Sequence, residues 1–295
     1  MATITIFGAG CSSPQAVPDK IAVDKLLEMT NKAAQQAFEK GYIDQAVTFY
    51  KQTLERAYLR DDLKEIVDAQ YNLALCLMIL QSYEQALAFI SHAKVEQFLA
   101  NQPISVDLQL LEATVFYRYG KPDEAWKITN YILSALKNTS VIQSKTHFLR
   151  GLIASKRGDT ALLRSAITAL GIPTEPKLRA DREELLGHLA LANYNWNAAI
   201  KAFDTATLLR RDTLDYRGMI LVLAKAGEAC EKAGLLGAAS RRYLRAGRSA
   251  ALQDDIHNAQ IWLTHAVQLA EQGGDKYVMP IARYLITQLQ VSAGD

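Results

Sequence analysis

The apolar residues of this chain recur at the spacing of amphipathic helices, and the helices come in neighbouring pairs. Residues 185–209 show this most clearly. An apolar helical stripe runs through 186–190, a polar break follows at 193–197, and a second stripe runs through 199–206. Two helices joined by so short a break lie antiparallel. The pattern therefore predicts a chain of helical hairpins.

A small residue followed twelve positions later by alanine marks most of these hairpins. Successive alanines of the pattern are 40, 39, 74 and 40 residues apart, and the long interval is two shorter ones. Small residues at these positions let paired helices approach closely where they cross, and a large side chain would push them apart. The spacing predicts about six units. The pairs are Ala34 with Ala46, Ala74 with Ala86, Ala113 with Ala125, Gly187 with Ala199 and Gly227 with Ala239, and Gly151 with Leu163 completes the series.

An aromatic residue four positions beyond the alanine and a glycine at the turn accompany this spacing. The aromatic residues are Tyr50, Phe203 and Tyr243, and the turn glycines are Gly41, Gly120, Gly158 and Gly234. Together these features resemble the tetratricopeptide repeat (TPR) family over roughly residues 26–290. The units are longer than the family's repeat of about 34 residues. Thr30, Gln70 and Glu183 stand where the family has tryptophan.

The resemblance implies an all-α, right-handed α-solenoid. We expect about six TPR-like helix pairs within residues 24–295, with a capping helix near 278–292. A slight bend is expected at 171–177, where the run GIPTEPK contains two prolines. In the family, the first helix of each pair lines the concave face, along which partners lie. The resemblance therefore implies a protein or peptide client in the concave groove.

The repeat register places a set of side chains on this concave face. Its aromatic members are the kind of residue that dominates binding energy at interfaces. Each of them also fits a second interpretation, contact with the neighbouring repeat. The partner-binding candidates are Asn31, Gln35, Tyr71, Met78, Tyr117, Arg118, Phe148, Lys156 and His188, and the face also carries Phe38, Leu75, Leu110, Thr114, Leu152, Glu184 and Glu228.

Composition and motifs narrow the class of function. The 295 residues carry a formal net charge of +2, which is too balanced to indicate nucleic acid. The sequence contains no hydrolase, phosphate-loop or metal-binding motif, and its histidines are scattered. We therefore expect no enzymatic activity, no cofactor, no metal and no small-molecule substrate. Cys76 and Cys230 occupy packing positions four repeats apart and are expected to be buried free thiols.

The first residues resemble the lipobox of a bacterial lipoprotein. Residues 9–11 (Ala-Gly-Cys) match the core of that motif, and two serines follow. The resemblance implies lipidation of Cys11, with 1–11 as the remnant of a signal peptide and 12–23 as a tether. Gly8 stands where leucine or valine is usual, and no basic residue precedes the short apolar stretch. We therefore expect a basic, apolar segment to be encoded upstream.

These features together predict a non-enzymatic, membrane-anchored adaptor or assembly factor of the bacterial cell envelope. A lipid anchor would hold it on the periplasmic face of the outer membrane. Two alternatives stay open at this point. One is a cytoplasmic TPR module with a regulatory or chaperone-like role, and the other is the helical part of a peptidoglycan-processing enzyme.

Overall fold

The computed structural model describes residues 24–136 and 141–292. Within these ranges every regular element is an α-helix, and there are fourteen. The predicted all-α class is therefore confirmed. The helices are α1 (Lys25–Glu39), α2 (Ile43–Leu59), α3 (Leu63–Ile79), α4 (Tyr83–Leu99), α5 (Val106–Arg118), α6 (Pro122–Ala135), α7 (Val141–Arg157), α8 (Thr160–Leu170), α9 (Pro176–Ala192), α10 (Trp196–Asp212), α11 (Tyr216–Lys232), α12 (Leu236–Ala251), α13 (Ile256–Gly273) and α14 (Val278–Ser292).

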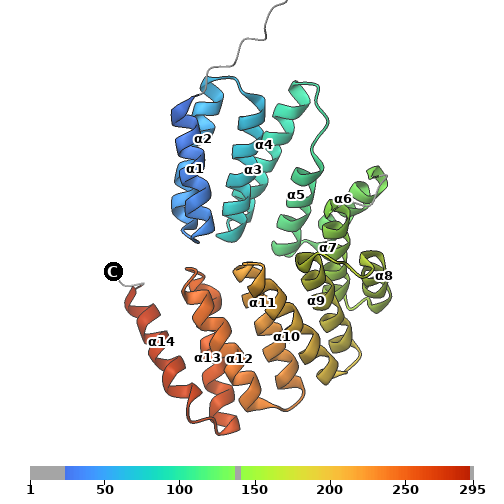
Figure 1. Ribbon diagram of the computed structural model, residues 1–295, viewed down its shortest axis with the longest axis vertical. Helices are drawn as coiled ribbons and strands as arrows, with labels where there is room; N and C mark the ends of the chain where they lie inside the picture. The colour runs from blue at the N-terminus through green and yellow to red at the C-terminus, as the bar shows by residue number, and fades with distance from the viewer. Residues whose placement is uncertain (1–23, 137–140, 293–295) are drawn as a thin grey trace, which may run out of the picture.

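The helices stack as consecutive antiparallel pairs and form an α-solenoid (Figure 1). The described residues make seven pairs, because α13 is the first helix of a further hairpin and α14 is its second. Helix α14 covers Val278–Ser292, the position expected of the capping helix. It packs on α13 and α12, and several of its side chains, Tyr284 among them, are exposed.

The turns inside the pairs follow a common geometry. One or two residues after the end of each first helix, a residue adopts positive φ in the first six pairs, and Gly41, Gly120, Gly158 and Gly234 occupy four of these positions. Glycine adopts this conformation without a steric penalty. Gln81 and Tyr194 occupy the other two, with φ of 60° and 59°. The next residue then leads into the second helix, as at Asp159, whose carboxylate accepts the backbone N–H of Leu162.

The small residues at the helix crossings are buried. A Cβ atom added at Gly187 would lie 2.5 Å from Cε1 of Phe203, the aromatic four residues beyond Ala199. At Gly151 the nearest atoms belong to Leu185 of the following pair. The glycine spacing therefore serves packing between pairs as well as packing within one pair.

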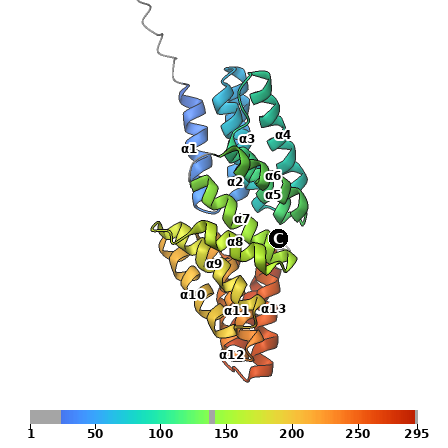
Figure 2. The ribbon, with the colours of Figure 1, turned by 90° about the vertical axis from the view of Figure 1, so that its right-hand side faces the viewer.

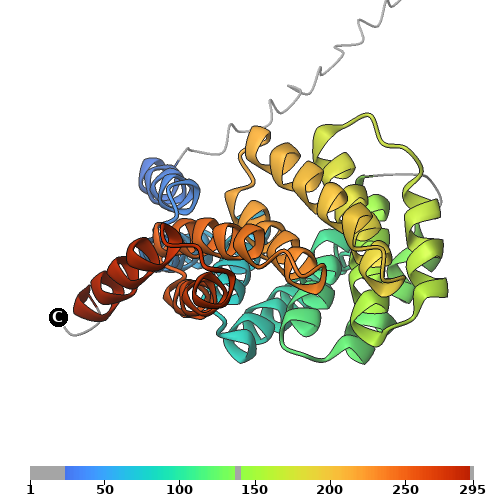
Figure 3. The same cartoon turned by 90° about the horizontal axis from the view of Figure 1, so that it is seen from below.

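The solenoid curves strongly. In Figure 1, α1–α5 form the upper part and α9–α14 the lower part, with the first and last pairs on the same side of the molecule. Figure 2 shows α7 and α8 between these two parts, and Figure 3 shows α1 and α14 toward the same edge when the molecule is seen from below. Residues 171–175, within the segment where a bend is expected, connect α8 to α9.

The curvature brings distant segments together. One small pocket is lined by Gly41 and Ile79 from the first two pairs and by Arg217, Asp255 and His257 from the C-terminal part. The solenoid therefore nearly closes on itself around an interior surface.

The cysteines of the described residues behave as predicted. Cys76 and Cys230 are free and buried, and burial raises the pKa of the Cys76 thiol to about 12. Cys11 lies outside the described residues, as do the proposed signal-peptide remnant and tether. Among the helices that the structure describes, none is long and apolar enough to cross a bilayer.

Candidate functional site

A pocket of about 560 Å³ lies on the inner surface of the solenoid. It is lined by the first helices of five successive pairs, α5, α7, α9, α11 and α13, and by Tyr243 of α12. We call it the interior pocket. Its wall is mostly apolar and aromatic, with charged side chains among the apolar ones. This combination is typical of ligand sites, which have volumes of roughly 300–1,000 Å³.

The structure brings four of the sequence-predicted candidates together here. Tyr117 and Arg118 of α5, Phe148 of α7 and His188 of α9 all line the interior pocket. Five further residues predicted on the concave face lie beside them: Leu110, Thr114, Leu152, Glu184 and Glu228.

The other candidates lie elsewhere. Asn31 and Gln35 are on α1 and do not line the interior pocket. Tyr71 lines a separate pocket of about 460 Å³ together with residues of α3 and α5. Met78 is buried with 6% of its surface exposed. Lys156 is exposed and does not line the interior pocket, but its Nζ lies 5.6 Å from the centre of the ring of Tyr117, which does.

Several lining residues were missed by the sequence reasoning. Asp181 lies three residues before Glu184 and seven before His188, so helical spacing alone places all three on one face. Tyr243 was assigned to the core; it is buried and also lines the pocket. Trp262 of α13 lies in the seventh pair, beyond the expected repeats.

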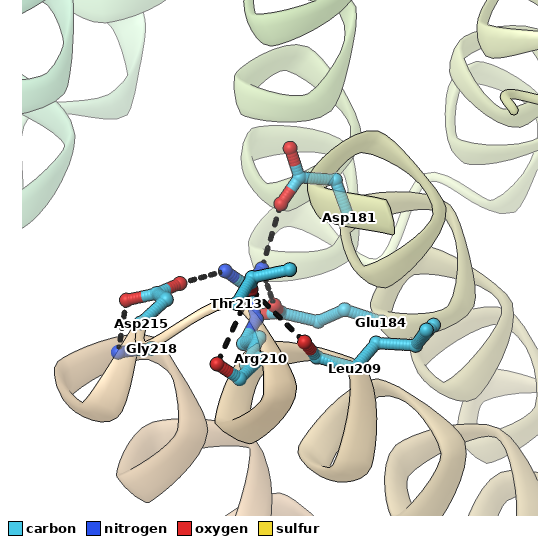
Figure 4. Close-up of polar contacts among 7 residues, drawn as sticks. All are labelled: Asp181, Glu184, Leu209, Arg210, Thr213, Asp215 and Gly218. Atoms are coloured by element: carbon cyan, nitrogen blue, oxygen red, sulfur yellow. Dashed lines mark hydrogen bonds and ion pairs between the residues drawn. The ribbon is translucent and has the colours of Figure 1, made fainter. Parts of the chain in front are cut away.

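An ionic cluster around Arg210, which we call the Arg210 cluster, contributes two carboxylates, Asp181 and Glu184, to the pocket wall. Figure 4 shows its polar contacts. Nη2 of Arg210 donates to Oδ1 of Asp181 at 2.8 Å and to Oε2 of Glu184 at 2.6 Å. Nη1 donates to Oδ2 of Asp215 at 2.5 Å. Asp181 and Glu184 come from α9, Arg210 from the last turn of α10 and Asp215 from the cap of α11.

Local sequence positions the members of this cluster. Arg210 lies at the C-terminal end of α10, where the helix dipole favours a positive charge. Asp215 caps α11 through Oδ1, which accepts the backbone N–H of Gly218 at 2.9 Å. A side chain at position 218 would clash with Asp215 and with Nη1 of Arg210. Gly218 therefore allows the carboxylate and the guanidinium to meet.

The cluster contains three carboxylates and one guanidinium, so its carboxylates are poorly compensated. Burial, together with the neighbouring negative charges of Glu184 and Asp215, raises the pKa of Asp181 to about 7 against the opposing charge of Arg210. Burial also raises the pKa of Glu184. For Arg210, burial alone would lower the pKa, but Glu184, Asp181 and Asp215 together raise it, so the guanidinium stays charged.

His188 is a neutral member of the same wall. Burial, assisted by the positive charge of Lys225, lowers its pKa to about 4. Its Nδ1 lies 3.1 Å from Oγ of Ser155, and its ring packs edge-on against Phe203 at a centroid distance of 5.3 Å. These contacts fix the imidazole as a packing and hydrogen-bonding group at neutral pH.

Opposite pH dependences of stability are expected from Asp181 and His188. The folded state holds an extra proton on Asp181 between about pH 4 and pH 7, so that group's contribution to stability falls as pH rises through this window. His188 is neutral when folded but protonated when unfolded between about pH 4 and 6.5, so its contribution rises with pH. Urea unfolding at several pH values measures both effects. As pH rises, the free energy of unfolding of Asp181→Asn should increase relative to that of the wild type, by up to about 1.4 kcal/mol per pH unit, and that of His188→Gln should decrease relative to the wild type. The same pH dependence in all three proteins would contradict these assignments.

The described residues contain no group of three or more histidine, cysteine, aspartate or glutamate side chains arranged to hold a metal ion. Among the acids of the interior pocket, Asp181 and Glu184 pair with Arg210, and Glu228 pairs with Lys225. What this arrangement offers is an apolar cavity with fixed charges, which suits binding.

Comparisons with known proteins agree with the fold. No protein-family model matches the chain, and no curated protein matches its sequence. Similar solved structures include the apo form of RapI, with a TM-score of 0.52, 10% identity, and coverage of 92% of this chain and 78% of that one. A Rap protein complexed with competence and sporulation factor has a TM-score of 0.50 and 12% identity, covering 90% of this chain and 98% of that one. A tetratricopeptide repeat protein from Parabacteroides merdae has a TM-score of 0.48 and 13% identity, covering 88% and 99%.

At these identities the likeness concerns the fold alone. The chain has a TPR-like α-solenoid fold, as the spacing of small residues and turn glycines predicts.

Proposed function

We propose that this chain is a non-enzymatic protein–protein interaction module that holds a segment of a client protein in the interior pocket. The observation that carries the proposal is the convergence of five successive first helices on one pocket. Side chains from successive repeats can contact one extended segment only on the inner surface of a solenoid.

The size and chemistry of the pocket indicate what enters it. A volume of about 560 Å³ accommodates a few side chains of a peptide segment and is far too small for a folded domain. Tyr117, Phe148 and Trp262 supply aromatic surface, which contributes strongly to binding when it is desolvated. One of the solved structures with the same fold is a Rap protein complexed with competence and sporulation factor, and this likeness in fold supports a binding role.

Peptide display provides the test of this function. A random dodecapeptide library panned against the chain should yield peptides that bind the wild type. Their affinity should fall by at least about tenfold in a Tyr117→Ala, Phe148→Ala double variant, because both anchors are lost. The matched control is Tyr131→Ala, because Tyr131 is an exposed aromatic on α6 that does not line the interior pocket. Selected peptides that bind the double variant and the wild type equally would contradict the proposal.

The location of this module forms a second part of the proposal. We propose that Cys11 is lipidated and that the solenoid is held on the periplasmic face of the outer membrane of a bacterial envelope. The support is the Ala-Gly-Cys-Ser-Ser run at residues 9–13. Stable anchoring takes at least two acyl chains, which a triacylated cysteine provides. A cytoplasmic TPR module is the alternative.

Labelling in cells distinguishes these two locations. When the gene is expressed from its native start in a bacterial host, labelled palmitate should be incorporated into the wild-type chain. The Cys11→Ser variant should take up no label and should leave the membrane fraction, while Cys230→Ser should change neither result. A wild-type chain that stays unlabelled and outside the membrane fraction would rule out the anchor and leave the binding proposal intact.

A further inference from the structure

We infer that the interior pocket selects its client segment by a positively charged side chain, lysine or arginine, which enters beside Asp181 and Glu184. This inference rests on the proposed function and names the chemistry that the same pocket recognises.

The charge balance at the pocket wall favours an incoming cation. Three carboxylates meet one guanidinium in the Arg210 cluster, so Arg210 can neutralise only one of them, and at neutral pH Asp181 is still partly protonated. Asp181 is nine-tenths buried, with 9% of its surface exposed. Only one of its oxygens, Oδ1, contacts Arg210, and Figure 4 shows the other directed away from the guanidinium. A second cation at this oxygen would compensate charge that Arg210 leaves uncompensated.

The aromatic side chains that line the pocket with these acids also favour a cation. Tyr117, Phe148 and Trp262 line the same pocket as Asp181 and Glu184. The faces of aromatic rings attract ammonium and guanidinium groups, most strongly where water is excluded. The guanidinium of Arg210 already lies 5.7 Å from the centre of the Phe148 ring. The aliphatic stem of an incoming lysine or arginine would pack on Leu152 and Leu221, which also line the pocket.

The pocket's own cations are either paired or exposed. Lys225 is paired with Glu228 at 2.8 Å, so it is committed to a neighbour. Arg118 and Lys145 are exposed, whereas Asp181 is buried. This arrangement would orient a bound client segment. Its cationic side chain would lie next to Asp181 and Glu184, and any acidic side chains beside it would lie near Arg118 and Lys145. An acidic side chain entering instead would lie against Asp181 and Glu184, which like-charge repulsion disfavours.

The experiment compares defined peptide pools on the intact chain. Three pools of acetylated, amidated pentapeptides carry arginine, citrulline or glutamate at the centre, with mixed residues around it. Citrulline matches arginine in shape but is neutral. Calorimetry with the wild type should show the arginine pool binding at least about tenfold more tightly than the citrulline pool, and the glutamate pool binding most weakly.

Variants link this preference to the named carboxylates. Glu184→Gln and Asp181→Asn each keep an acceptor for Arg210 but remove a charge, so each should reduce the preference for arginine to about threefold or less. Glu183→Gln is the matched control, because Glu183 is the adjacent carboxylate and lies near Arg182 rather than in the pocket. It should keep the wild-type preference. Thermal melting checks that each variant is folded. If a variant unfolds, the comparison of the three pools on the wild type still tests the inference.

The possible outcomes separate the two proposals. Equal binding of the arginine and citrulline pools, lost in a Phe148→Ala variant, would overturn the cationic selection while keeping the peptide-binding function. Tightest binding of the glutamate pool would overturn the selection as well and assign the recognition to Arg118 and Lys145. Failure of every pool to bind would contradict both proposals.

Discussion

Replacing Arg210 with methionine is expected to lower the free energy of unfolding by about 3–5 kcal/mol at neutral pH. Methionine keeps much of the apolar stem but removes the charge that Asp181 and Glu184 share. Two buried carboxylates would then face each other without a cation. Urea unfolding followed by circular dichroism measures the loss.

The adjacent residue provides the control for this prediction. Arg211 is exposed and pairs with Asp212 on the surface, so Arg211→Met should change stability by less than about 0.5 kcal/mol. The loss in Arg210→Met should also shrink toward pH 5, because protonation removes the repulsion between Asp181 and Glu184. Equal losses for the two arginine variants would show that the buried cluster contributes nothing particular to stability.

Replacing Gly187 with leucine is expected to cost about 3 kcal/mol, the upper end of the usual cost of overpacking. Even a Cβ atom at this position would lie within 2.8 Å of three atoms of the Phe203 ring. Phe203 is fully buried and cannot move aside without separating α9 from α10. Thermal and urea unfolding of the variant should both show the loss.

A double-mutant cycle tests the cause of that loss. Phe203→Ala alone should also cost about 3–5 kcal/mol, because it leaves a cavity. The combined variant should be destabilised by clearly less than the sum of the two, since the leucine would occupy the space left by the ring. Additive losses would show that position 187 does not pack against Phe203.

The fold was predictable because its determinants are local and repeated. The spacing from Gly187 to Ala199 and the turn glycines act within one hairpin, so a single sequence displays them. The turns at Gln81 and Tyr194 could not be predicted in the same way. These residues adopt positive φ although neither is glycine, and backbone hydrogen bonds close both turns, from the Gln81 N–H to the Met78 carbonyl and from the Tyr194 N–H to the Leu191 carbonyl. The packing of Gly151 against Leu185 was also missed, because it joins two pairs.

The residues that the central helix pairs contribute to the candidate site could be predicted from the sequence, but the role of the first pair could not. Tyr117, Phe148 and His188 follow from the repeat register, because each lies on a first helix near the centre of the array. Asn31 and Gln35 were placed on the same face but do not line the interior pocket. The curvature that decides this accumulates over several pairs and cannot be read from one unit.

The Arg210 cluster shows a second limit of the sequence reasoning. Glu184 was expected on the concave face, but its partner lies 26 residues away on α10. Arg210 lies four residues beyond Ala206 and seven beyond Phe203, so helical spacing places it on the buried stripe of α10, whereas Arg211 is exposed. The spacing does not show which carboxylates meet the buried arginine, because α9 supplies Asp181 and Glu184 only when it packs against α10.

A crystal structure of the chain bound to a peptide selected by display would show directly where the client segment binds. We expect the peptide in the interior pocket, in contact with Tyr117 and Phe148 and with first helices from α5 to α13. We also expect a lysine or arginine side chain of that peptide next to Asp181 and Glu184. A peptide bound to the outer surface formed by the second helices, with the interior pocket unchanged, would contradict the proposed binding function.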